Sequence, residues 1–237
     1  MKTFVFLLYL VKITVQEIVS NLPDSKSAYI ELHYFPCLAY FACISSYESI
    51  LLESAENYTK QSYRNRCNIR TANKVANLSV PVVKGNTKQR IKDIHIDYSE
   101  NWIKDHWRTI ASGYGKAPFF SELAPVFERI LHKKHTFLFD LNLEILTNCL
   151  RILRWKKEIR LSNEYFKGSE IPNDFRDRIH PKKTELLTDL YKVVPYTQNF
   201  GSDFVPNLSI LDILFCEGIY ASDLICQSSV NPQGHNF

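Results

Sequence analysis

The apolar positions near the start of the chain follow a strand, helix, strand pattern. Ala28–His33 is a short apolar run typical of a buried strand, and it ends in a turn at Pro36. Leu38–Ile44 has the continuous apolar character of a buried helix, and Ser49–Glu53 is a second strand-like run. A strand, a tight turn, a helix and a strand form a βαβ unit, which predicts a parallel sheet.

A second set of apolar runs follows a polar, basic segment. Leu78–Val83 is rich in β-branched residues but contains Pro81, so we expect a strand at the edge of a sheet. The spacing of Ile91, Ile94 and Ile96 predicts a further strand.

From Asn101 onward the apolar spacing becomes helical. Trp102, His106, Ile110 and Tyr114 lie four residues apart and therefore share one helix face. Two further helices are predicted over residues 121–132 and 136–153, and Glu158–Leu161 is predicted as a strand. A last helix is predicted with Asn207 or Ser209 as its cap. The pattern as a whole predicts an α/β fold, with an N-terminal mixed or parallel sheet followed by a largely α-helical C-terminal half.

The two ends of the chain differ from its middle. The apolar run from Phe4 to Val11 follows Lys2 and is too short to span a bilayer. No clear cleavage site follows it, so we expect a cytoplasmic protein without a transmembrane span, with secretion as the alternative. We predict a leader or appended helix over residues 1–27, one domain over 28–218 and a tail over 219–237.

Charge is concentrated in one part of the chain. The 237 residues carry a net charge of +4, but the segment from Glu56 to Lys116 alone contains 12 Lys/Arg against 5 Asp/Glu. Such a segment attracts anions, including phosphates, carboxylates and nucleic acid. The six cysteines form no CxxC pair and no zinc spacing, so we predict reduced thiols and no metal site.

The first predicted turn carries candidate chemistry without a known phosphate-binding motif. His33 and Tyr34 stand at the carboxyl end of the first strand, where open α/β sheets bind ligands. We predict His33 as a catalytic base and Tyr34 as a substrate-binding residue. The alternative is that Tyr34 only packs the helix against the sheet.

The basic segment supplies the predicted anion-binding residues Tyr63, Arg64, Asn65 and Arg66. If this stretch is a strand, Arg64 and Arg66 project to the same side, and two guanidinium groups suit a phosphate or a carboxylate. The alternative is a solvated edge strand whose charges prevent aggregation.

The first long helix and two loops supply further candidates. His106 is either a packed core histidine or a second general base, because basic neighbours would keep it neutral. We also predict substrate contacts from Trp107, Arg108, Lys116 and His180. Asp177 lies three residues before His180 and could orient its imidazole.

Several words of the sequence together resemble one known family. They are His33-Tyr34-Phe35-Pro36, Arg64-Asn65-Arg66, Leu78-Ser79-Val80-Pro81-Val82, His106-Trp107-Arg108, Tyr114-Gly115-Lys116-Ala117-Pro118, Phe139-Asp140-Leu141-Asn142, Ile179-His180-Pro181-Lys182 and Pro206-Asn207-Leu208-Ser209. In this order they are similar to the WbqC-like family of bacterial proteins, over residues 28–218. After Gly218 the family usually continues Pro-Asn-Ala, whereas this chain has Ile219-Tyr220-Ala221.

The resemblance implies a role in bacterial surface-polysaccharide (O-antigen) synthesis. It also implies a transferase that moves an aminoacyl or acyl group onto a nucleotide-linked amino sugar. The predicted partner is an anionic small molecule; no motif indicates a cofactor, and a nucleotide or nucleotide sugar is compatible with the basic segment. A nucleic-acid-binding module and a non-catalytic partner of a polysaccharide-assembly complex are the alternatives. The pI of about 8.6 and the lack of a known nucleic-acid-binding motif argue against the former.

Overall fold

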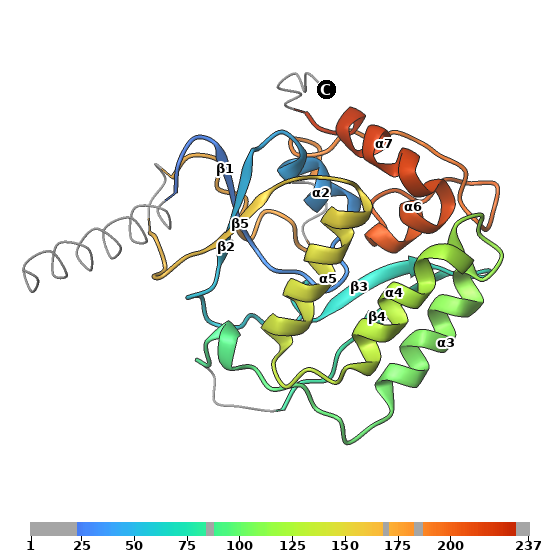
Figure 1. The fold of residues 1–237 in the computed structure, drawn as a ribbon, viewed down its shortest axis with the longest axis horizontal. Helices are drawn as coiled ribbons and strands as arrows, with labels where there is room; N and C mark the ends of the chain where they lie inside the picture. The colour runs from blue at the N-terminus through green and yellow to red at the C-terminus, as the bar shows by residue number, and fades with distance from the viewer. Residues whose placement is uncertain (1–22, 84–87, 168–170, 183–186, 231–237) are drawn as a thin grey trace, which may run out of the picture.

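A parallel sheet of three strands forms one side of the molecule, as the computed structural model shows for residues 23–83, 88–167, 171–182 and 187–230 (Figure 1). Strands β1 (Ser27–Glu31) and β5 (Glu158–Leu161) flank β2 (Ser49–Glu53), and both pairings are parallel. Helix α2 (Leu38–Ser45) connects β1 to β2. The predicted βαβ unit is therefore confirmed.

A separate antiparallel ribbon of two strands follows β2 in the chain. It consists of β3 (Arg66–Arg70) and β4 (Val75–Ser79), and only one face of β3 is buried. The predicted strand over Leu78–Val83 is wrong, because the ladder ends at Ser79 and Pro81 has no N–H to extend it. Beyond it, Val82 makes only an isolated bridge to Ile96.

The strand predicted from Ile91, Ile94 and Ile96 is also wrong at its start. Residues Ile91–Asp93 form a short 3₁₀-helix, η1, which packs against a later helix. All three isoleucines are buried, so their spacing indicates that the segment is buried, although it is irregular and does not pair as a strand.

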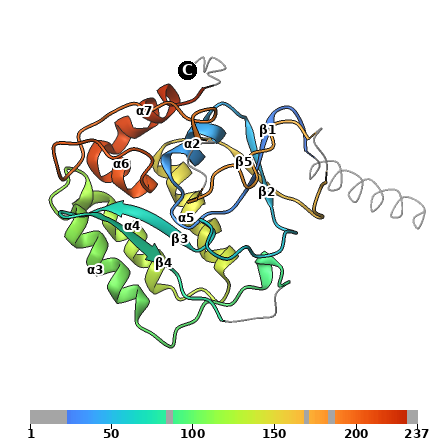
Figure 2. The same ribbon diagram turned by 180° about the vertical axis from the view of Figure 1, so that it is seen from behind.

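Helices make up nearly all of the regular secondary structure described in the C-terminal half and confirm the predicted fold class (Figures 1 and 2). They are α3 (Trp102–Tyr114), α4 (Phe120–His132), α5 (Leu138–Ile152), α6 (Ile210–Glu217), η3 (Gly218–Tyr220) and α7 (Ala221–Gln227). The predicted apolar face of α3 is buried at Trp102, His106, Ile110 and Tyr114. Ser209 rather than Asn207 caps α6, since its hydroxyl accepts the N–H of Leu211.

The last helix packs into the core. Ala221 and Ile225 of α7 are fully buried, and α7 contacts α2. Residues 1–22 of the predicted leader and 231–237 of the predicted tail lie outside the described part of the chain. Within the described part, no helix is both long enough and apolar enough to cross a bilayer.

A buried carboxylate joins three segments of the chain. Asp212 of α6 accepts hydrogen bonds from the Tyr114 hydroxyl at 2.9 Å, the Tyr196 hydroxyl at 2.6 Å and Gln198 Nε2 at 3.0 Å. Burial raises its pKa, and the three donors oppose that change. The carboxylate thereby fixes α6 against α3 and against the segment before it.

Close packing of α3 on β3 depends on a glycine. A Cβ added to Gly113 would lie 2.7 Å from the backbone oxygen of Arg70. We predict that Gly113→Ala lowers the free energy of unfolding by about 1–3 kcal/mol, because neither backbone can give way cheaply. Urea denaturation measures this value, and Ser112→Ala, on the exposed side of the same helix, is the matched control. Equal stability of the two variants would contradict the prediction.

Candidate functional site

Two glutamates occupy matching positions at the carboxyl ends of the parallel strands. Glu31 ends β1, Glu53 ends β2, and the two residues are paired in the register. Both side chains are almost completely buried. Buried carboxylates require charged or hydrogen-bonding partners, so this end of the sheet is held together by polar contacts.

Glu53 is neutralised by an arginine from a distant loop. Arg176 donates to Glu53 at 2.9 Å, and Ser162 and the Ala55 N–H donate at 2.8 and 2.7 Å. The Tyr29 hydroxyl donates to the same carboxylate. The Arg176 guanidinium also lies over the Tyr29 ring, 4.1 Å from its centroid.

Glu31 holds a histidine and a second arginine. His33 Nε2 lies 3.1 Å from Glu31 Oε1, and Arg64 Nη1 lies 3.7 Å from the same oxygen. The Asp177 backbone N–H donates to the carboxylate at 3.3 Å. Burial alone would raise the pKa of Glu31, but the His33 hydrogen bond and the Arg64 charge outweigh it and lower the pKa to about 2.

The Arg64 side chain is buried and binds carboxylates within the protein. It is 1% exposed, and its guanidinium donates to Glu56 from Nε and Nη2 and to Asp177 from Nη2 at 3.0 Å. Strand β3 begins only at Arg66, so the expectation that Arg64 and Arg66 project from one strand is corrected. Because Asp177 contacts Arg64, its carboxylate is part of this network.

His33 is completely buried between two tyrosine rings. The Tyr40 and Tyr63 centroids lie 5.1 and 5.6 Å from that of His33. With Nε2 directed at Glu31, Nδ1 is left buried without a hydrogen-bond partner among the described residues. An ionised Glu31 favours the proton on Nε2, which leaves the Nδ1 lone pair able to accept a proton.

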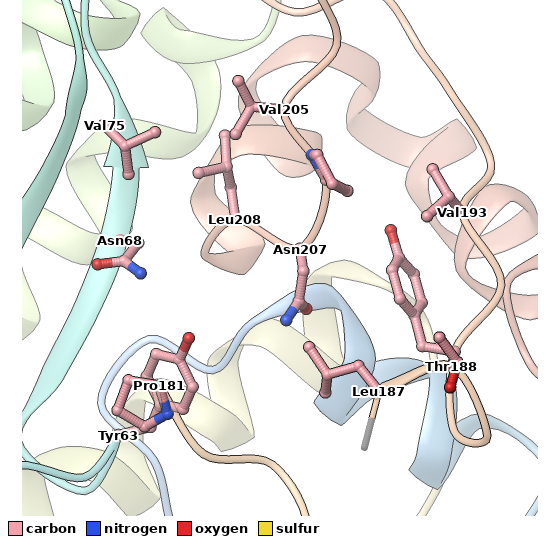
Figure 3. A pocket seen from close by; sticks show the side chains of 12 residues that line it. Tyr63, Asn68, Val75, Pro181, Leu187, Thr188, Val193, Val205, Asn207 and Leu208 are labelled. Carbon is pink, nitrogen blue, oxygen red and sulfur yellow. The ribbon is translucent and has the colours of Figure 1, made fainter. Parts of the chain in front are cut away.

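Tyr63 also lines a cavity of about 380 Å³ (Figure 3). Its described lining comes from four parts of the chain: Tyr63, Asn68 and Val75, then Pro181, then Leu187, Thr188, Tyr191 and Val193, then Val205, Pro206, Asn207 and Leu208. These lining residues include no lysine, arginine or histidine. The predicted arginines thus do not form the walls of this cavity.

The first turn of α2 is not available to an anion. The N–H of Leu38 donates to the Leu208 carbonyl at 3.0 Å, and the N–H of Ala39 donates to Asn207 Oδ1 at 2.9 Å. Helix N-termini bind anions through such N–H groups when they are free. Here the segment before α6 satisfies them and fixes the β1–α2 turn, in which Phe35 adopts a positive φ of 41°.

His106 and Tyr34 lie in an aromatic cluster of the core. The Tyr34 hydroxyl and His106 Nδ1 are 2.9 Å apart, and the Trp102 ring packs on the imidazole. Burial lowers the pKa of His106 to about 4, so the ring is neutral at pH 7. The geometry is that of the packed core histidine that the sequence allowed as the alternative.

The remaining predicted site residues are dispersed. Asn65 is buried and donates to the Val80 carbonyl at 2.8 Å, and the Trp107 ring stacks on Phe120. Arg108 and Lys116 are exposed, and His180 Nδ1 accepts the N–H of Lys182 at 3.1 Å. The structure therefore brings together His33, Tyr63 and Arg64 from the predicted set, and Arg66 lies two residues before the cavity residue Asn68 on β3.

The residues that sequence reasoning missed are Glu31, Glu53, Glu56 and Arg176. A signal for two of them was present, since the strand sequences SAYIE and SILLE both end in glutamate. Among the described residues no group of His, Cys, Asp or Glu side chains could hold a metal ion. The cysteines are free, and burial raises the pKa of the Cys67 thiol well above its usual range.

Comparison with known proteins gives the family. The model of the WbqC-like protein family matches residues 32–180. This chain is a member of the WbqC-like family. It is 31% identical over 231 residues to the uncharacterised protein Rv1507c of Mycobacterium tuberculosis, a match that covers 84% of this chain and 97% of that protein. No solved structure matches the chain. The predicted resemblance is confirmed, and the matched region includes His33 and Arg64 but begins one residue after Glu31.

Removal of Arg64 tests the buried network. We predict that Arg64→Ala lowers the free energy of unfolding by about 3–5 kcal/mol, because Glu31 and Glu56 lose their buried counter-charge. Urea denaturation at pH 7 measures the change. Arg108→Ala, which removes an exposed guanidinium 3.9 Å from Asp105, is expected to change it by less than about 1 kcal/mol. An Arg64→Ala protein as stable as Arg108→Ala would contradict this account of the network.

The lowered pKa of His106 predicts an acid-sensitive fold. The stabilisation from keeping this ring neutral is complete above pH 6.5 and is lost as the pH falls from 6.5 towards 4, where only the unfolded state binds the proton. It amounts to at most about 3 kcal/mol. We predict that His106→Gln flattens the stability profile in this window, whereas His132→Gln, at an exposed position, leaves its slope unchanged. Identical slopes in both variants would refute it.

Proposed function

We propose that this protein is a transferase that joins an acyl or aminoacyl group to the amine of a nucleotide-linked amino sugar in bacterial surface-polysaccharide synthesis. The observation that carries the proposal is the Glu31–His33 pair at the carboxyl end of β1, next to a cavity. This is where open α/β sheets bind their ligands. Membership of the WbqC-like family supports the substrate class.

Each residue of the pair has a defined role in this reaction. The sugar amine attacks the carbonyl carbon of an activated donor, a thioester or an acyl phosphate, and a C–N bond forms as the bond to the leaving group breaks. His33 Nδ1 accepts the proton that the amine loses and returns it to the leaving group. Glu31 holds Nε2 at 3.1 Å, fixes the tautomer and stabilises the imidazolium.

Tyr63 controls access to this base. Its ring packs on His33 and also lines the cavity, and His33 has no exposed surface. A bound amine reaches Nδ1 when the Tyr63 ring turns away from the imidazole.

Arg66 is the cation best placed for the phosphates. It lies two residues before Asn68 on β3, so both side chains project from the same face, roughly 7 Å apart along the strand. Its Nε is buried and has no hydrogen-bond partner in the described part of the chain. The guanidinium is thus available to a diphosphate at the edge of the cavity.

Mass spectrometry tests the reaction directly. Purified protein is incubated with UDP- and dTDP-linked amino sugars and a panel of acyl thioesters and acyl phosphates, and the amide product is detected by mass. We predict turnover for at least one pair, and a fall in kcat of about 100-fold or more in His33→Gln with little change in KM. His132→Gln, at an exposed position on α4, is the matched control. No product from any pair, or full activity of folded His33→Gln, would overturn the proposal.

A further inference from the structure

We infer that the cavity beside Tyr63 binds an uncharged group rich in hydrogen-bond acceptors, such as the N-acyl group and ring of a sugar. The side-chain amides of Asn68 and Asn207 supply the donors. The inference rests on the proposed function and deepens it by naming the part of the amide product that enters the cavity. The geometry that supports it does not involve the transfer step.

The orientation of Asn207 is fixed by the start of α2. Its Oδ1 accepts the backbone N–H of Ala39 at 2.9 Å, and only the oxygen of an amide can accept that hydrogen. Asn207 also has a positive φ of 54°, a conformation that asparagine tolerates better than most residues. The Nδ2 group is therefore the donor end of this side chain. It interacts with the Cys37 sulfur, and its second hydrogen is left for a ligand, since Asn207 lines the cavity (Figure 3).

Asn68 presents the same group from the opposite wall. Its Oδ1 accepts from Asn77 Nδ2 at 3.0 Å. The same Asn77 nitrogen lies 3.4 Å from the Cys67 carbonyl oxygen, a contact that only a nitrogen donor satisfies. Figure 3 shows the Asn68 nitrogen directed across the cavity towards Asn207. Two amide NH₂ groups from different parts of the chain thus face one space.

The other walls favour a neutral ligand. Valine, leucine and proline side chains make up most of the described lining, with the rings of Tyr63 and Tyr191. No cationic side chain is among these lining residues, and moving a phosphate into such surroundings costs several kcal/mol. The volume of about 380 Å³ is near the lower end of the range for small-molecule sites. Apolar walls with a few fixed donors suit a sugar ring that carries an amide carbonyl.

Isosteric variants test the donors separately from the shape. Asn207→Asp keeps an oxygen for the Ala39 N–H and replaces the NH₂ donor with a second oxygen. Asn68→Asp does the same opposite Asn77. The probes are N-acetylglucosamine, N-acetylgalactosamine and inorganic phosphate, followed by saturation-transfer NMR and calorimetric titration of the full chain. Asn148→Asp, on α5 and remote from the cavity, is the matched control.

We expect an N-acetylated sugar to bind wild type and Asn148→Asp equally, and to bind each cavity variant at least 10-fold more weakly. Phosphate is expected to give no signal that depends on Asn68 or Asn207. Thermal unfolding confirms that the variants are folded, and either aspartate variant alone suffices if the other is unstable. Failure of both sugars to bind wild type, unchanged affinity in a folded cavity variant, or phosphate binding that either substitution abolishes would each overturn the inference. Sugar binding without any transfer would instead overturn only the proposed function.

Discussion

The structure depends on neutralising two carboxylates at the ends of parallel strands. Glu31 and Glu53 are adjacent in the sheet and have almost no contact with water, so each requires a cation that reaches it through the protein. Arg64 arrives from the segment before β3 and Arg176 from the loop after β5. Pairing these charges joins three distant parts of the chain at the edge where α/β sheets bind ligands. The packing of these loops and the construction of the site therefore share one cause.

The need to pair these buried carboxylates also changes the interpretation of the basic segment from Glu56 to Lys116. Its excess of lysine and arginine suggests a surface that attracts anions, yet Arg64 is buried and forms ion pairs with Glu31, Glu56 and Asp177. Two of these carboxylates lie outside the segment in the sequence and cannot enter a local count of charge. The cavity has no cation among its described lining residues, and Arg66 lies on the same face of β3 as the lining residue Asn68. In the proposed function, recognition therefore divides between the neutral cavity and the Arg66 guanidinium.

The sequence predicted those features that repeat along a single element. The apolar runs of β1, α2 and β2 and the four-residue spacing of α3 appear as buried faces in the structure. The strands predicted over Leu78–Val83 and through Ile91, Ile94 and Ile96 were wrong, because the spacing of isoleucine and valine indicates burial but does not identify a pairing strand. For a related reason, the sequence identified only some residues of the candidate site. Arg64 and Asp177 are 113 residues apart, and no periodicity connects them.

The position of His33 has a consequence for how the site works. The imidazole is bound by Glu31 and lies against the rings of Tyr40 and Tyr63. The turn that follows β1 contains Phe35, which has a positive φ. Such a turn persists only where its surroundings fix it, and here the segment before α6 bonds directly to the start of α2. His33, Glu31 and the α2 turn are consequently rigid. Tyr63 alone among these groups contacts both the imidazole and the cavity, so in the proposed reaction any coupling between ligand binding and His33 passes through its ring.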